Sequence, residues 1–193
     1  AYYIQPSEDF SRAGSVWYAK PTDTSVYPLF DEVTTAYHEG FPGHHLQIGV
    51  QMCLGDELTR AHRLALWYDG YGEGWALYCE SLGKELGLYD DPYQYFGMLS
   101  AEMHRAIRLV VDTGLHTKGW TREDAIAYSL ENEAEPEAAI ISEIERYMAN
   151  PGQALSYKIG QLKILELREN ASQKLADHFS ISTFHEKVLE TGC

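Results

Sequence analysis

The sequence predicts a mainly α-helical domain with a small amount of β-structure near its N-terminus. From residue 31 onward, apolar residues recur at helical spacing over most of the chain. Helix start and stop signals divide this part into separate segments. Only one short run, near the N-terminus, has the composition of a strand. The length of 193 residues suits a single domain over residues 1–193 with a sizeable core.

The first 29 residues predict loop structure around one strand. The loop signals are four punctuating residues: Pro6, Gly14, Pro21 and Pro28. Residues 15–19 form the short strand-like run, which we expect to pair with strands outside the chain in a longer parent protein. Four aromatic residues here can line a substrate cleft, although aromatics more often pack in a core: Tyr2, Tyr3, Trp17 and Tyr18.

The predicted helices follow in order. The first begins near Asp31 and extends to about Leu54, with an interruption at Pro42 and Gly43. A second covers residues 57–69, and a break at residues 70–72 precedes a third that carries Glu73 and ends near residue 87. A long helix opens at residues 90–92 with an Asp N-cap and a first-turn Pro. Further helices are expected from residue 121, from 136 to 147, from 153 to 178 and from 183 to 190.

Composition excludes some classes of protein. The formal net charge of −14 argues against binding to nucleic acid or to an anionic membrane surface. No apolar run approaches the length of about 20 residues that spans a membrane. Three widely spaced cysteines make neither a disulfide framework nor a thiolate zinc site. The chain opens without Met and reads as an internal piece of a longer chain, so its compartment is not predicted.

The segment around His38 carries the chemistry. His38 is followed directly by Glu39, and His44 and His45 come six and seven residues after His38. Zinc peptidases use H-E-x-x-H, in which two His one helical turn apart bind the ion and Glu acts on water. On an unbroken helix, His44 would lie about 120° around the axis from His38, and His45 about 10 Å along it. Neither arrangement lets two rings share an ion.

The Pro42-Gly43 pair offers a solution to this spacing. Pro42 removes a helical hydrogen bond and clashes with the preceding turn, and Gly43 tolerates unusual backbone angles. A two-residue bulge would place His44 where the second His of the ordinary motif lies. We therefore predict His38 and His44 as metal ligands and Glu39 as general base, with His45 as the next ligand candidate. The alternative is a polar, broken helix end with surface histidines.

A third ligand is suggested by a resemblance. The segment Glu73-Gly74-Trp75-Ala76 is similar to the N-E-G-F-A segment of gluzincin aminopeptidases, whose Glu completes the zinc shell. The resemblance implies that Glu73 is the third zinc ligand; an acid in a helix first turn is the structural alternative. Glu80 lies two helical turns further along, which is too far to reach the same ion. We predict that it holds a ligand His by its far ring nitrogen.

Four motifs in order resemble the bacterial domain-of-unknown-function 885 family. They are H-E-G-F-P-G-H-H-L-Q, G-E-G-W-A-L-Y, R-x-x-R-L-V-V-D-T-G-L-H and P-G-Q-A-L-S-Y-K-I-G. The resemblance covers most of the chain. Members of that family are much longer, so it implies that this chain is the C-terminal metal-site region, and that the missing N-terminal region of the same parent chain is a partner. It further implies a zincin-like fold and peptidase-like chemistry.

Other candidate residues lie on the later helices. His104, Arg105, Arg108 and Asp112 form a polar stripe. Arg108 and Asp112 can pair across one turn, or Asp112 can orient a ligand His. His116 and Tyr157 are candidates to stabilise the oxyanion, with an ordinary loop His and a core Tyr as alternatives. An acidic run over residues 131–135 is expected to be a solvated surface.

The predicted function is a zinc-dependent hydrolase of peptide or small amide substrates. Zinc would be held by His38, His44 and Glu73, and Glu39 would take the proton from the attacking water. The alternative is a non-catalytic metal- or ligand-binding helical domain, inactive without the missing N-terminal part. Two His and one carboxylate also suit iron in an oxygenase, but the adjacent His-Glu pair favours hydrolysis.

Overall fold

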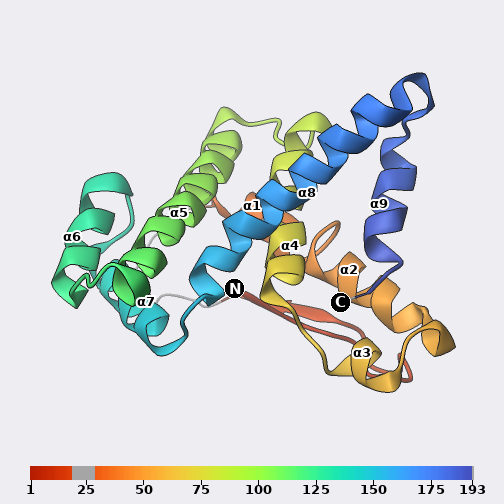
Figure 1. The fold of residues 1–193 in the computed structure, drawn as a ribbon, viewed down its shortest axis with the longest axis horizontal. Coiled ribbons are helices and arrows are strands. Elements are labelled where there is room, and N and C mark those ends of the chain that lie inside the picture. Colours follow the sequence, from red (N-terminus) through yellow and green to blue (C-terminus); the bar gives the residue numbers. More distant parts are fainter. Residues whose placement is uncertain (19–28, 193) are drawn as a thin grey trace.

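The computed structural model describes residues 1–18 and 29–192, and it confirms a mainly α-helical fold. The elements run in the order β1 (Tyr2–Ile4), β2 (Ser15–Trp17), α1 (Glu32–Glu39), α2 (His44–Cys53), η1 (Gly55–Glu57), α3 (Arg60–Leu64), α4 (Asp69–Glu85), α5 (Pro92–Thr117), α6 (Arg122–Asn132), α7 (Glu137–Ala149), α8 (Gln153–Leu175), η2 (Ala176–His178) and α9 (Ile181–Leu189). Figure 1 shows α8 crossing α4, with α6 and α7 beside the C-terminal end of α5.

The predicted strand forms, but its partner was not foreseen. β2 pairs antiparallel with β1, with Tyr2 opposite Trp17 and Ile4 opposite Ser15. The partner strand therefore lies within the chain rather than outside it. This ribbon lies beside α2 and α3 (Figure 1). The expected strand end at residue 19 and the loop signals Pro21 and Pro28 fall outside the described residues.

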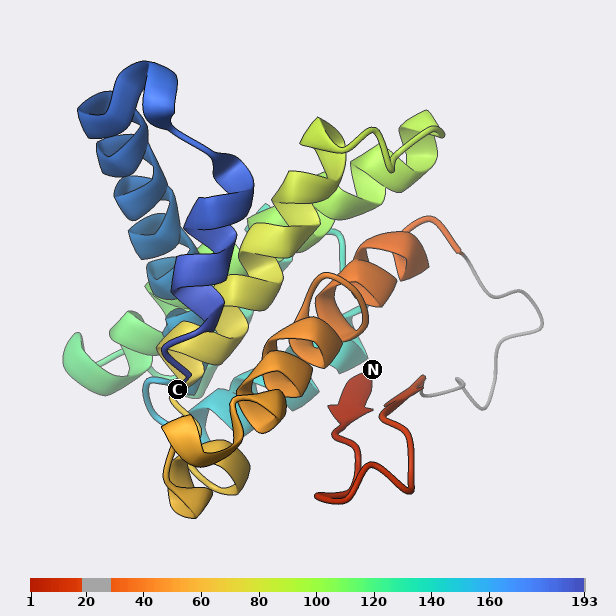
Figure 2. The ribbon, with the colours of Figure 1, turned by 90° about the vertical axis from the view of Figure 1, so that its right-hand side faces the viewer.

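Two groups of buried side chains hold the helices together. One joins α5, α6, α7 and the start of α8 through Ile107, Val111, Ala125, Ile140, Ile144, Tyr147 and Ala154. The other joins α4, α8 and α9 through Trp75, Tyr78, Cys79, Leu82, Ile164 and Leu189. Figure 2 shows α9 returning beside α8, so that α4 is covered on that side. Because the middle of α4 is buried, Glu73 and Glu80 are held in fixed positions.

Helix starts follow the predicted capping chemistry. The Asp91 side chain accepts from the backbone N–H of Tyr93, with Pro92 in the first turn of α5. Thr121 and Asp124 form a reciprocal capping box at the start of α6. α4 differs from expectation, since it begins at Asp69 and includes both Gly70 and Gly72, which were expected to break it.

Close packing explains why glycine is tolerated inside α4. A Cβ on Gly72 would lie 2.2 Å from the Trp67 ring, and a Cβ on Gly74 would lie 2.5 Å from the Cα of Gly160 in α8. In turn, a Cβ on Gly160 would come within 1.9 Å of the carbonyl oxygen of Gly70. Gly70, Gly74 and Gly160 therefore let the backbones of α4 and α8 touch. This contact outweighs the low helix propensity of glycine.

We predict that Gly160→Ala destabilises the protein by about 1–3 kcal/mol, the range for inserting atoms into a packed interior. The added methyl meets backbone atoms of α4, which cannot rotate away as a side chain can. Gly49→Ala is the matched control, because a Cβ on this α2 residue meets nothing within 4 Å. It should hold or raise stability by about 0.5–1 kcal/mol. Urea unfolding of the two full-length variants tests this, and equal stabilities would contradict the packing argument.

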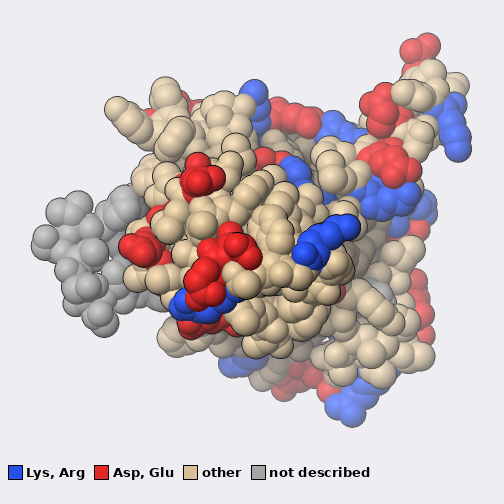
Figure 3. Space-filling view, turned by 60° about the vertical axis from the view of Figure 1, so that its left-hand side comes forward, with Lys and Arg blue, Asp and Glu red and all other residues tan. Residues whose placement is uncertain are grey.

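The surface of the described residues is acidic in character, as the net charge requires. Figure 3 shows Asp and Glu side chains scattered over one face among mainly uncharged residues. Within residues 1–18 and 29–192, none of the helices is long and apolar enough to cross a membrane.

One of the acids expected on a solvated surface is instead held inward. The Glu133 Oε2 atom lies 2.5 Å from Nδ1 of His104, and its side chain is only 6% exposed.

Candidate metal centre

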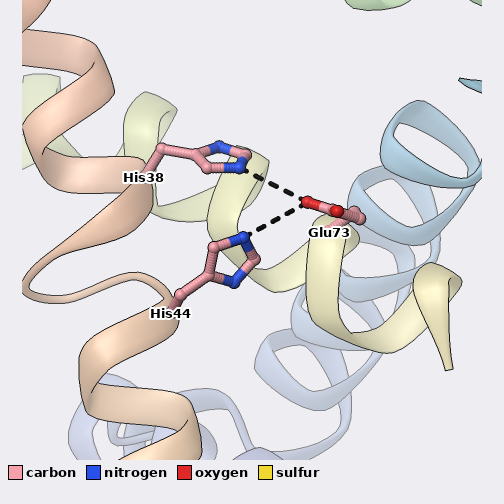
Figure 4. A group of neighbouring side chains, drawn as sticks. All are labelled: His38, His44 and Glu73. Atoms are coloured by element: carbon pink, nitrogen blue, oxygen red, sulfur yellow. Dashed lines mark ion pairs between the residues drawn. The ribbon is translucent and has the colours of Figure 1, made fainter. Parts of the chain in front are cut away.

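His38 and His44 come from two helices separated by a short loop. His38 lies in the last turn of α1, the loop covers residues 40–43, and His44 is the first residue of α2. The expected interruption at Pro42 and Gly43 therefore takes the form of a loop between two helices, rather than a kink in one. Because the chain leaves the helix here, the angular mismatch between residues six apart is removed. Figure 4 shows both rings pointing toward Glu73 on α4.

The loop is held against α4 by specific contacts. Trp75 donates from Nε1 to the carbonyl oxygen of Pro42 at 2.9 Å, and the Cys79 thiol reaches the same oxygen at 3.4 Å. A Cβ on Gly43 would lie 1.9 Å from the carbonyl oxygen of His38, so only glycine fits. Gln47 is buried and donates to the carbonyl oxygen of Tyr71, which ties α2 to the same helix. The loop that positions both histidines is thus built on the helix that carries Glu73.

The three side chains form one compact donor group. Glu73 Oε2 lies 3.4 Å from Nε2 of His38 and 3.3 Å from Nε2 of His44. One donor atom from each residue lies within 4.8 Å of the other two. Ligands about 2.0–2.2 Å from a tetrahedral zinc ion lie about 3.3–3.5 Å from one another. The two distances to Glu73 match this separation. Apart from these two ion-pair contacts, Glu73 Oε2 is buried and has no hydrogen-bond partner among the described residues, so the residues present fit a cation.

The electrostatics of the group point the same way. Burial disfavours the charged form of His38, but its bonds to Glu73 and Glu80 raise its pKa to about 9. Burial likewise disfavours the Glu73 carboxylate, yet attraction by His38 and His44 holds the pKa of Glu73 well below its usual range. Without an ion, the buried acids therefore retain a proton on His38. A metal cation between the same atoms would supply that positive charge instead.

Glu80 holds the far nitrogen of His38. Its Oε1 lies 2.7 Å from His38 Nδ1, and its Oε2 accepts from the Thr34 hydroxyl at 2.7 Å. The Glu80 side chain is 2% exposed. Two helical turns separate Glu80 from Glu73, as the sequence predicts. Glu80 therefore contacts Nδ1 of His38, while Glu73 lies near Nε2 of the same ring. This bond fixes the orientation of the ring and favours the tautomer with Nε2 available to an ion.

We predict that Glu80→Gln lowers metal affinity about 10- to 100-fold, the usual effect of losing such an outer partner. The ligand atoms themselves stay in place, so weakened binding rather than abolished binding is expected. Glu85→Gln is the matched control, because Glu85 lies on the same helix with a side chain 53% exposed and pairs with Arg168. Competition against a chelator of known affinity measures the metal affinity of both variants. If the two variants bind metal equally well, Glu80 does not support the site.

Glu39 and Tyr157 complete the walls around the donor group. Glu39 is buried and lines two adjoining cavities, of about 300 and about 360 Å³, which also share His38 and Tyr157. The Tyr157 ring stacks on the His38 ring at 6.0 Å between centroids. Burial raises the pKa of Tyr157, so its hydroxyl keeps its proton and remains a donor. An acid that can accept a proton and a phenol that can donate one thus border the same space.

Three candidate residues lie elsewhere. His45 turns to the other side of α2, where its Nδ1 lies 2.8 Å from the Tyr3 hydroxyl. His116 Nε2 lies 3.0 Å from the carbonyl oxygen of Tyr147, and His116 lines neither cavity beside His38. Asp112 accepts from the backbone N–H of Gly152 at 3.0 Å and faces His116 rather than a ligand His. Asp112 and His116 lie away from His38 because they are near the end of α5 that packs on α7.

Two residues at the site were not assigned from the sequence. Trp67 meets the His44 ring edge-on at 5.6 Å between centroids. Arg105 lines the smaller cavity together with His38 and Glu39. The available signal in the sequence was that Arg105 belongs to the predicted polar stripe. Arg108, on the same stripe, donates to Gln153 and lies 4.0 Å over the Tyr157 ring, rather than pairing with Asp112.

Comparisons with known proteins place these observations in a family. The family model described as "Bacterial protein of unknown function (DUF885)" matches residues 1–193. A crystal structure of a "putative lipoprotein" from Colwellia psychrerythraea is 48% identical with a TM-score of 0.93, and the match covers 100% of this chain and 32% of that one. A "putative lipoprotein of unknown function" from Shewanella oneidensis is 26% identical with a TM-score of 0.72, over 82% of this chain and 29% of that one. No curated protein matches.

Proposed function

The chain belongs to the DUF885 family of bacterial proteins, and on that premise we propose that it forms the metal site of a zinc-dependent hydrolase acting on peptide or similar amide bonds. The observation that carries the proposal is the donor group of His38, His44 and Glu73 at tetrahedral ligand spacing, with Glu39 in the walls of the two cavities that His38 also lines. A structural zinc site is normally closed by four protein ligands. Three ligands next to an open cavity suit a catalytic site instead.

Zinc is the ion that the donor set favours. Two imidazoles and one carboxylate are the ligands of several zinc hydrolases, although the same set also holds iron in oxygenases. The base at Glu39 distinguishes the two, because hydrolysis needs a proton acceptor next to the ion and oxygenation does not. The zincin-like character of the site rests on this arrangement of residues, in which a loop replaces the unbroken helix of H-E-x-x-H.

Each residue has a role in the proposed reaction. A bound zinc ion would polarise the substrate carbonyl and make water acidic enough to attack at neutral pH. Glu39 accepts the proton that this water loses and returns it to the nitrogen of the leaving amine. The Tyr157 hydroxyl donates to the oxygen on which negative charge develops. Glu80 keeps His38 in its binding tautomer through Nδ1.

The rest of the parent protein is part of the proposal. The chain spans about a third of the length of the solved relatives it matches. Both cavities beside His38 are open in the described residues, and we propose that the missing N-terminal region of the parent chain forms their remaining walls. Substrate selection would then depend on both regions, while the reacting groups come from this one.

Metal analysis of the full-length protein, purified without chelator or an affinity metal, tests the proposal. We expect about one equivalent of zinc, and hydrolysis of a peptide library that a chelator stops and added zinc restores. Mass spectrometry of the library identifies the cut bond. Absence of bound metal after zinc is supplied, or bound iron without hydrolysis, would overturn the proposal.

A further inference from the structure

Arg105 is a half-buried cation in the wall of the candidate site. It lies on α5 and lines the cavity that also contains His38, Glu39 and Tyr157. Its Nε atom is buried and has no hydrogen-bond partner among the described residues. Its guanidinium group faces the Tyr157 ring at 5.3 Å from the centroid. Leaving a buried guanidinium nitrogen without a hydrogen bond is costly, and an acceptor on a bound ligand would remove that cost.

Among the described residues, no acid that lines this cavity forms an ion pair with Arg105, and two of these acids have partners of their own. Glu80 binds His38 and Thr34. Glu143 pairs with Arg146 at 2.6 Å. The remaining charged groups that line the cavity or approach it are Asp31, Glu39, Glu135 and the His104–Glu133 pair. Among the described residues that line it, Arg105 is the one arginine or lysine, and its Nε is open to an incoming anion.

We propose that Arg105 binds the C-terminal carboxylate of a peptide substrate, so that the enzyme releases C-terminal residues. The inference rests on the proposed hydrolase function and adds the substrate class. Arginine is suited to this task, because its planar fork matches a carboxylate with two parallel hydrogen bonds. A substrate held in this way places its last peptide bond between Arg105 and the donor group of His38, His44 and Glu73.

The shape of the two cavities agrees with this direction of binding. The cavity at Arg105 is about 300 Å³, at the lower end of the range for ligand sites. One face of α5 forms its wall with small side chains: Gly97, Ser100 and Ala101. This space suits one terminal residue rather than a continuing chain. The other cavity carries Tyr3, Ile48 and Trp67 beside His44 and Glu73, and would take the acyl part of the peptide.

The reaction balances as an ordinary hydrolysis. The amide C–N bond breaks, and the oxygen of water joins the acyl carbon to give a new carboxylic acid. The proton taken by Glu39 goes to the leaving nitrogen, which departs as the amino group of a free amino acid. Arg105 takes no part in these bond changes. It positions the substrate through the carboxylate that this amino acid already carries.

Two matched peptide libraries test the proposal with the full-length protein. Both contain the same acetylated tripeptides, one as free acids and the other as C-terminal amides. The wild-type protein should cleave the free acids with a kcat/KM at least about 10-fold higher, since hydrogen bonds to a charged group are lost with the amide. Arg105→Gln should bring this ratio close to one, mainly through KM on the free acids, and Arg105→Lys should restore part of it.

Binding gives a second readout that does not depend on turnover. Calorimetry on Glu39→Gln protein should show tighter binding of free acids than of amides, and Arg105→Gln in that background should remove the difference. Arg122→Gln is the control, because this arginine on α6 pairs with Glu145 and is not among the residues that line the cavity. Equal cleavage of both libraries by wild type, or an unchanged ratio in Arg105→Gln, would overturn the role of Arg105 alone. Failure to cleave either library would overturn the hydrolase proposal and this inference with it.

Discussion

Glu39→Gln should reduce kcat by about 10²- to 10⁴-fold, the contribution expected of a general base, while leaving the metal content at one equivalent. Gln keeps the size of the side chain but cannot accept a proton from water at neutral pH. Glu39 is not one of the three grouped donors, so the ion should remain bound. The change should fall on kcat rather than on KM, since the carboxylate acts on the attacking water and not on the bound peptide.

Glu39→Asp is the control for this variant. It retains the carboxylate but draws it back by one methylene, so activity should lie between those of Glu39→Gln and the wild type. Metal content measured on the same preparations separates loss of the base from loss of the site. Unchanged turnover by metal-loaded Glu39→Gln would refute the role of Glu39. Lost metal would show instead that Glu39 supports the ligands.

The helical architecture could be predicted because its signals are local. Asp91 and Pro92 mark the start of α5, and Thr121 with Asp124 marks the start of α6, each through bonds within one turn. The errors arose where distant segments meet. Gly72 looks like a helix breaker in sequence, but contact with Trp67 makes glycine the residue that fits there. Tertiary packing overrides local propensity in such places.

The candidate metal site could likewise be predicted only in part. Two of its features are visible within single segments of the sequence. They are the adjacency of His38 and Glu39, and the two-turn spacing from Glu73 to Glu80. The positions of His116 and Arg105 cannot be predicted in this way, because each depends on how α5 packs against other helices. His116 meets the backbone of α7, whereas Arg105 faces the cavity that α1 borders. Both residues carry functional side chains, and only the packing of α5 tells them apart.

The loop of residues 40–43 connects the fold to the site. A continuous helix would separate the rings of His38 and His44, so the helix must break for them to share an ion. The break leaves the Pro42 carbonyl without a helical partner, and Trp75 and Cys79 on α4 satisfy it. The same helix, α4, also carries Glu73. The three candidate ligands are therefore held in place by the fold itself, without the need for a bound ion.

His38→Ala and His44→Ala should each abolish stoichiometric metal binding, whereas His45→Ala should retain it. The three variants make the same chemical change within eight residues of one segment, but only the first two remove an atom that faces Glu73. Affinity should fall by more than the roughly 100-fold that marks an outer partner such as Glu80. Elemental analysis after dialysis against trace zinc measures all three.

The same comparison separates the two possible ligand pairs. His45 bonds to the Tyr3 hydroxyl on the β-ribbon, so its loss should cost only a little stability there. Circular dichroism of each variant shows whether a lost ion reflects a lost ligand or a lost fold. If His45→Ala lost the ion and His44→Ala kept it, α2 would have to turn by about 100° in the full-length protein, one residue's rotation about a helix axis. Such a turn would bring His45 in place of His44 toward Glu73, and the centre described above would be wrong.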